Sequence, residues 1–183
     1  KRPVTRVAVV AFSSNSSLCG AFNSNVAKML ERALEDYQSL GKENILIYPV
    51  GRKMEEAVKK MGYVPQGSYQ VLAEKLMHEF VEKQIDHVEL IYHHFKSMGS
   101  QVLLRENYLP IDLTQVAQEA AEDVPEDARS FNNDYIVEPS VGELIAELLP
   151  KVLSQKIFTA ALDSNASEHA ARTLAMQIAT DNA

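Results

Sequence analysis

Blocks of apolar and polar residues along this chain predict alternating strands and helices. Near the N-terminus, Thr5 to Phe12 reads TRVAVVAF, a nearly unbroken run of β-branched and apolar residues. Such a run suits a strand that is covered on both faces, as in a parallel sheet. Ser24 to Leu40 then carries apolar residues at helical spacing and is followed by Gly41, so we expect a helix that ends there.

The same alternation continues through the middle of the chain. We expect a strand at 44–50, helices at 53–61 and 69–83, and two strands at 87–97 and 101–109. The link between the last two strands is only Met98, Gly99 and Ser100, which favours a hairpin. This order of elements predicts an α/β fold with a three-layer, Rossmann-like sheet and an antiparallel edge hairpin.

The C-terminal third contains weaker signals and then a strong helical one. The acidic, Ala-rich segment 114–127 predicts a linker or a weak helix, and 131–137 predicts a last short strand. Ser140 and Glu143 form a Ser-x-x-Glu capping box, so a helix is expected to begin there and to end near Pro150. A second, long helix is expected from Leu153 onward. We therefore divide the chain into a globular domain, 1–150, and the beginning of a C-terminal coiled-coil helix, 151–183.

Small residues form a stripe along the predicted last helix. Such a stripe lets another helix approach closely but buries little area by itself. The plainer interpretation packs it on the sheet, at least in its first turns. The sharper interpretation is that a partner helix lies outside this sequence, and we expect a domain taken from a longer protein. The stripe comprises Ala160, Ala161, Ser164, Ala171, Ala175 and Ala179.

Charge and cysteine content narrow the classes of function. The net charge of −7 disfavours a nucleic-acid-binding protein, because phosphate contacts require basic residues. A single cysteine, Cys19, excludes an internal disulfide and a Cys-rich metal site. No run approaches the roughly 20 apolar residues of a membrane helix, so any membrane contact is expected to go through a partner.

The turn at Ser13 to Phe22 is the first candidate for chemistry, because the start of a helix can bind anions. It contains only Gly20 and no following lysine, so neither a dinucleotide fingerprint nor a P-loop is present. Cys19 could act as a nucleophile with His93 or His94 as its base. Adjacent strand residues point to opposite faces, so at most one of the two could reach it. A small buried cysteine is the commoner case.

The evidence for a metal site is equally weak. His87 and His93 lie six positions apart on one strand, about 20 Å, which is too far for one ion. Glu74, His78 and Glu82 fall on one helix face and could hold a metal, although a solvated charged face is commoner. We therefore expect no catalytic, cofactor-binding or metal-binding residues.

Three stretches together give a specific signal. Residues 18–25 read LCGAFNSN, 134–139 read DYIVEP, and 166–183 read ASEHAARTLAMQIATDNA. In order and spacing they resemble motifs of the gamma subunit of F-type ATP synthases. Ser17 stands where that family has glycine, and Asn15-Ser16 replaces its acidic–basic pair. The resemblance covers essentially the whole chain.

The resemblance implies a non-catalytic rotor subunit without cofactors, which transmits torque between the ion-driven c-ring and the catalytic alpha/beta ring. Expected partners are the epsilon subunit, the c-ring and the alpha and beta subunits. Expected localisation is peripheral, on the cytoplasmic face of a bacterial inner membrane or the equivalent organelle face, with membrane contact only through the c-ring. The alternative from another class is a small doubly wound α/β enzyme or nucleotide-binding domain.

The resemblance also implies partner-binding residues. Tyr135 and Glu138 match the family's Tyr-x-x-Glu-Pro stretch and are expected to face the c-ring or epsilon. Glu168 and Arg172 are four apart on the last helix, in the favourable order for an ion pair. They are expected to serve the shaft by pairing across a coiled coil or reaching toward a beta subunit. The plainer interpretation is that they decorate a solvated helix face.

Overall fold

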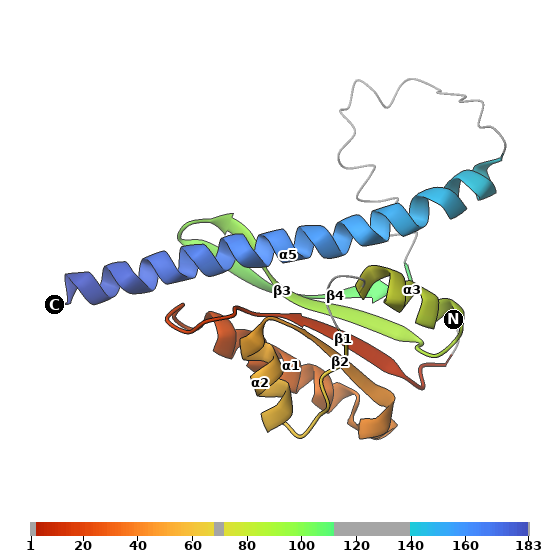
Figure 1. Cartoon of the computed structure of the whole chain (residues 1–183), viewed down its shortest axis with the longest axis horizontal. Helices are drawn as coiled ribbons and strands as arrows, with labels where there is room; N and C mark the ends of the chain where they lie inside the picture. The colour runs from red at the N-terminus through yellow and green to blue at the C-terminus, as the bar shows by residue number, and fades with distance from the viewer. Residues whose placement is uncertain (1–2, 68–71, 112–139, 183) are drawn as a thin grey trace.

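The computed structural model describes residues 3–67, 72–111 and 140–182. Four strands form one open sheet in the order β2-β1-β3-β4 (Figure 1). β1 pairs in parallel with both β2 and β3, and β4 pairs antiparallel with β3 to form the predicted hairpin. The bounds are β1 (Val7–Phe12), β2 (Ile45–Val50), β3 (His87–Ser97) and β4 (Ser100–Leu109).

Helices cover both faces of the sheet, which makes the three layers that the sequence predicts. α1 (Phe22–Asp36) and α2 (Arg52–Lys60) lie on one face, and α3 (Leu72–Val81) and α5 (Val141–Asp181) lie on the other (Figure 1). Side chains of β1 lie in the cores on both faces of the sheet, because successive side chains of a strand point to opposite faces. Its even-numbered residues Ala8, Val10 and Phe12 pack under α3 and α5, while its odd-numbered residues pack under α1 and α2.

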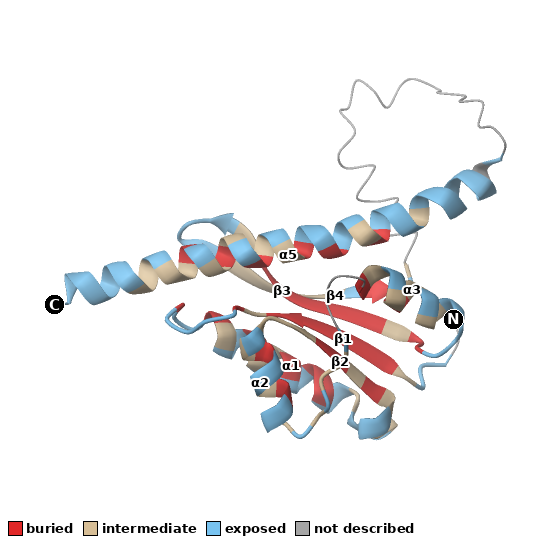
Figure 2. Ribbon diagram, in the orientation of Figure 1, coloured by how far each residue is buried: buried red, intermediate tan, exposed pale blue. Residues whose placement is uncertain are grey.

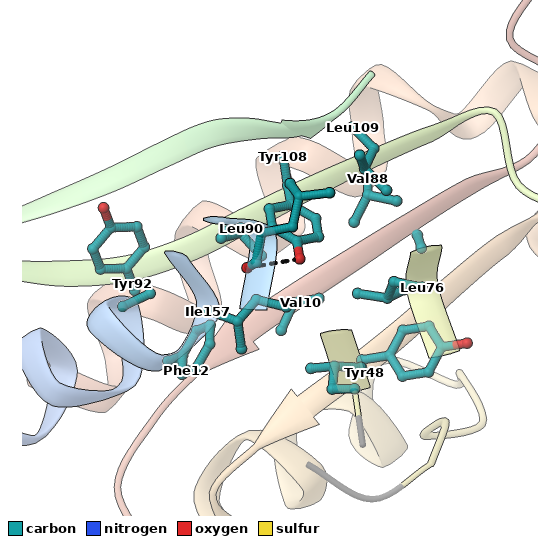
Figure 3. Packing of buried hydrophobic residues seen from close by; sticks show 14 of the residues in the cluster. Val10, Phe12, Tyr48, Leu76, Val88, Leu90, Tyr92, Tyr108, Leu109 and Ile157 are labelled. Carbon is teal, nitrogen blue, oxygen red and sulfur yellow. Dashed lines mark hydrogen bonds between the residues drawn. The ribbon is translucent and has the colours of Figure 1, made fainter. Parts of the chain in front are cut away.

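This double coverage explains the unbroken apolar run of β1. All six of its residues are buried, so no position tolerates a polar side chain without a partner (Figure 2). The core on the α5 side is seen in Figure 3, where Ile157 of α5 lies among Phe12, Val10 and Leu90 of the strands. In the same cluster, the buried Tyr108 hydroxyl donates a hydrogen bond of 3.0 Å to the carbonyl oxygen of Leu153.

α5 is one continuous helix of 41 residues, so the predicted break near Pro150 is wrong. Proline in a helix interior costs about 3 kcal/mol, because its ring removes a backbone donor and crowds the preceding turn. Here Leu149 packs partly against the core and Leu153 is buried in it, on either side of the exposed Pro150. This packing on both sides offsets the local cost of the proline. The capping box is confirmed, since Ser140 Oγ accepts a hydrogen bond from the Glu143 N–H.

Most other element boundaries are close to the predicted ones. The hairpin strands agree to within one residue. The predicted end of the first helix at Leu40 is wrong, because α1 begins at Phe22 and ends at Asp36. The chain continues from there through two short 3₁₀ turns around Gly41, whose φ of 84° only glycine adopts readily. The predicted linker at 114–127, the strand at 131–137 and the first residues of the helix at 69–83 lie outside the described residues. None of the described helices combines the length and apolarity needed to cross a membrane.

Candidate functional site: the junction between the body and the last helix

The junction is the contact between α5 and the rest of the described protein, here called the body, which comprises the sheet with α1, α2 and α3. α5 crosses the face of the sheet over β3, and both of its ends extend past the sheet (Figure 1). The residues of α5 that are buried against the body recur at intervals of three and four, as one face of a helix requires. This buried stripe comprises Leu153, Ile157, Ala160, Ser164, Ser167 and Ala170.

Small residues in the buried stripe bring α5 close to β3. Ser167 is fully buried, and its hydroxyl donates a 3.4 Å hydrogen bond to the carbonyl oxygen of His93. The plainer interpretation of the small-residue stripe is therefore confirmed for its first turns, because Ala160 and Ser164 pack on the body. Further along, Ala175 is half-buried and Ala179 is exposed.

Polar contacts join one flank of α5 to the hairpin. His94 Nδ1 lies 2.6 Å from Asp163 Oδ2, and Lys156 Nζ lies 3.6 Å from Glu106 Oε2. The Tyr92 hydroxyl also donates to Glu106, at 3.1 Å. The side chains of Asp163 and Lys156 are only partly buried, so these contacts lie at the edge of the buried stripe and not within it.

The opposite flank of α5 meets the first turn, residues 13–21, which joins β1 to α1. Arg172 donates a hydrogen bond of 2.7 Å to Ser16 Oγ and another of 3.3 Å to the Ser17 carbonyl oxygen. The same guanidinium lies 2.5 Å from Glu168 Oε1. The Arg172 and Glu168 side chains are 19% and 14% exposed, so the interpretation as a solvated pair is wrong. Helical spacing predicted the pair, but nothing in the sequence indicated its contact with the first turn.

The first turn is held by hydrogen bonds to Asn23, at the start of α1. The Asn23 amide donates to Ser14 Oγ at 2.8 Å, to the Ser16 carbonyl oxygen at 3.2 Å and to Cys19 Sγ at 3.2 Å. Ser14 and Cys19 are both buried. These bonds account for the local geometry of the turn without a bound phosphate.

The two histidines weighed as a base for Cys19 have other neighbours. His93 stacks on Phe22 with ring centroids 4.3 Å apart, and burial lowers the pKa of His93 to about 4, so its ring is neutral at pH 7. His93 and Cys19 line the same open hollow of about 270 Å³, but within the described residues no hydrogen bond joins them. His94 is bonded to Asp163 instead.

A buried ionic cluster joins α1 to the sheet on the face opposite α5, and no pattern in the sequence indicated it. Glu89, only 8% exposed, accepts hydrogen bonds from Arg105 at 2.8 and 3.2 Å and from the Tyr37 hydroxyl at 2.7 Å. Burial alone would raise the pKa of Glu89, but the hydrogen bonds from His87, Arg105 and Tyr37 outweigh it and hold this pKa at about 2. Arg105 also reaches Asp36 of α1, at 2.5 Å.

The last two groups of predicted site residues are the candidate metal ligands Glu74, His78 and Glu82 and the expected partner-binding residues Tyr135 and Glu138. Within residues 3–67, 72–111 and 140–182, no three His, Cys, Asp or Glu side chains are grouped so that they could hold a metal ion, and this includes Glu74, His78 and Glu82. Tyr135 and Glu138 lie outside the described residues.

All 183 residues match a family model described as ATP synthase. Proteins called ATP synthase gamma chain are similar over the whole chain: that of Bacteroides fragilis is 66% identical, that of Bacteroides thetaiotaomicron 61% and that of Phocaeicola vulgatus 55%. The chain spans 65%, 66% and 65% of these relatives, just under two thirds of their length.

Solved structures share the fold, among them two assemblies of mitochondrial ATP synthases. The central stalk and c-ring structure of Tetrahymena thermophila mitochondrial ATP synthase matches with a TM-score of 0.65 and 21% identity, over 98% of this chain and 79% of that chain. The rotor of Euglena gracilis mitochondrial ATP synthase matches with a TM-score of 0.62 and 20% identity, over 98% of this chain and 68% of that chain. At such identities the likeness concerns the fold.

Proposed function

This chain belongs to the ATP synthase family, among its gamma chains, and from that premise we propose that it is part of the central-stalk rotor subunit of an F-type ATP synthase. In this role it transmits torque between the ion-driven c-ring and the catalytic alpha/beta ring and catalyses no reaction itself. The alternative, a doubly wound enzyme or nucleotide-binding domain, has no support in the first turn, whose polar groups are bonded to Asn23 of α1.

The main observation behind this proposal is the length of the junction and the variety of contacts in it. Contacts between α5 and the body run from Leu153 to Arg172, about 28 Å of helix at the usual rise. They combine apolar packing, backbone hydrogen bonds and ion pairs. A helix held in this way moves with the body as one unit, which a rotor needs.

The outward face of α5 supports a partner helix on the side opposite the sheet. Several large apolar side chains there are roughly half exposed, and their spacing places them together opposite the buried stripe. We propose that the N-terminal helix of the full-length protein packs on them, as the resemblance implies for the coiled-coil shaft. These residues are Leu144, Leu148, Phe158 and Leu162. The expectation that Ala160 and Ser164 face that helix is wrong, because both pack on the body.

The proposed partners are the c-ring, the epsilon subunit and the alpha and beta subunits. We keep Glu168 and Arg172 as proposed partner-binding residues, because they lie beside the tip of the first turn, where the Leu18 side chain is 77% exposed. The proposed localisation is peripheral, at the cytoplasmic face of a bacterial inner membrane, with membrane contact only through the c-ring. The bacterial relatives support this location.

Rotation of the body tests the function directly. Lys59, whose side chain is 61% exposed on α2, is replaced by cysteine in the full-length protein and coupled to a bead, in a complex whose alpha/beta ring is fixed to a surface. We expect the bead to turn in one direction when ATP is added and to stop without it. The control carries the bead on an alpha subunit and should not turn. A body that stays still while the complex hydrolyses ATP would contradict the rotor assignment.

Crosslinking tests the proposed contacts of Tyr135 and Glu138. In the assembled complex, Tyr135→Cys or Glu138→Cys is expected to crosslink to a polar loop of the c subunit or to epsilon. The matched control is Lys60→Cys, an exposed position of α2, which should give neither product. The contact proposal fails if neither position crosslinks and both cysteines resist labelling by a small maleimide.

A further inference from the structure

Two sets of polar contacts lie on opposite flanks of α5. Successive residues of a helix are about 100° apart, so the residues just before and just after buried positions fall on opposite sides of the buried stripe. Lys156 and Asp163 come directly before the buried Ile157 and Ser164. Glu168 comes one position after the buried Ser167, and Arg172 one position after Ala171, which is half-buried.

The partners of the two flanks also lie on opposite sides of β3. In the sheet, β3 lies between β1 and β4. The first flank meets the hairpin, through His94–Asp163 and Glu106–Lys156. The second flank meets the turn that follows β1, where Arg172 is bonded to Ser16 and Ser17. A turn of α5 about its own axis in either direction therefore stretches one of the two sets.

Beyond Ile157, the buried stripe between the flanks offers little resistance to such a turn. Its side chains shrink along the helix from Leu153 and Ile157 to Ala160, Ser164, Ser167 and Ala170. Small side chains make a smooth surface with few knobs that interlock with a facing sheet. Packing alone therefore holds α5 near the sheet more firmly than it fixes the rotation of α5 about its axis.

We infer that His94, Asp163 and Arg172 are positioning residues of torque transfer: together they clamp α5 from both flanks and set its rotational angle on the body. The inference rests on the proposed rotor function and deepens it. The His94 and Asp163 side chains are 43% and 24% exposed, and pairs so exposed add little to folding stability. The role of this pair in fixing an angle is therefore separable from folding.

Distance measurements between spin labels test the clamp in the complex that contains the full-length protein. Nitroxides are placed on Ser97→Cys, at the end of β3, and on Asn165→Cys, an exposed position on the Glu168 flank of α5. A rotation of α5 carries the second label toward or away from the first. We expect a narrow distance distribution that broadens in the double variant Asp163→Asn, Arg172→Gln.

Two further variants make the result specific. Lys151→Gln removes an ion pair with Glu147 that lies entirely within α5, and the distribution should stay narrow. The exchange variant His94→Asp, Asp163→His, made with Arg172 intact, restores the pair in reverse and should be as narrow as the parent, whereas Asp163→Asn alone should be broader. A distribution that stays narrow in the double variant overturns the clamp, and so does an exchange variant as broad as Asp163→Asn.

The same samples separate the clamp from the rotor function. Protons pumped per ATP hydrolysed are measured alongside the distances. A broadened distribution with normal pumping supports the clamp and contradicts torque transfer through this junction. A narrow distribution contradicts the clamp, whatever the rotation of the body shows.

Discussion

Replacing Arg105 with alanine is expected to lower the free energy of unfolding by about 3–5 kcal/mol, the usual cost of leaving one member of a buried ion pair alone. Arg105 donates two hydrogen bonds to Glu89, which is 8% exposed, and it also reaches Asp36. Without the guanidinium, the Glu89 carboxylate stays buried beside only the Tyr37 hydroxyl and His87. Urea denaturation of the purified full-length protein measures the loss.

A matched control removes a cation from an exposed pair. Lys59→Ala breaks the contact with Glu55 on α2, where the side chains are 61% and 49% exposed. The expected loss is below about 1 kcal/mol. Equal losses in Arg105→Ala and Lys59→Ala would show that the buried cluster does not stabilise the fold in the way its geometry indicates.

The pH dependence of stability checks the same cluster independently. The pKa of Glu89 is lowered from 4.5 in the unfolded chain to about 2 in the fold. The carboxylate's contribution is therefore fully present above pH 4.5 and is lost as the pH falls from 4.5 toward 2. A difference of this size corresponds to about 3 kcal/mol. Glu89→Gln cannot titrate, so its stability should fall less steeply than that of the parent over this pH range.

Periodicity in the sequence predicted most of the fold because its signals are local. The run of β1, the helical spacing of α1 and the short link of the hairpin each depend on neighbouring residues. Pro150 misled for the same reason: its local cost is real, but packing of Leu149 and Leu153 on the core overrides it. Tertiary packing of that kind leaves no mark on the local pattern.

The junction contacts could not be predicted, because they join residues far apart in the chain. Arg172 and Ser17 are separated by 155 positions, and His94 and Asp163 by 69. The sequence analysis singled out Arg172 and Glu168, but not the residues of the first turn that Arg172 also binds. Ser16 and Ser17, where the chain departs from the family's pattern, are the two residues of the first turn that accept hydrogen bonds from Arg172. The backbone carbonyl contact would survive a glycine at position 17, whereas the hydroxyl contact depends on the serine at position 16.

The contact between Ser167 and β3 is where a single substitution should most disturb the proposed function. Ser167 is fully buried, with its hydroxyl 3.4 Å from the His93 carbonyl oxygen. Ser167→Leu forces a larger side chain between α5 and β3, and overpacking of this kind costs about 1–3 kcal/mol. Ser167→Ala loses only one long hydrogen bond, so it should cost no more than about 1 kcal/mol.

The strain in Ser167→Leu is relieved when α5 moves away from β3. We therefore expect the body to stay folded while its contact with α5 is lost. In complexes that contain the full-length protein, ATP hydrolysis should continue, and protons pumped per ATP should fall strongly. Thr159→Leu, at an exposed position of the same helix, adds the same bulk without meeting the sheet and should pump normally. Should Ser167→Leu prevent assembly, Ser167→Val provides a smaller wedge with the same expected direction. Normal pumping in assembled complexes carrying Ser167→Leu would mean that torque does not pass through the contact between α5 and β3.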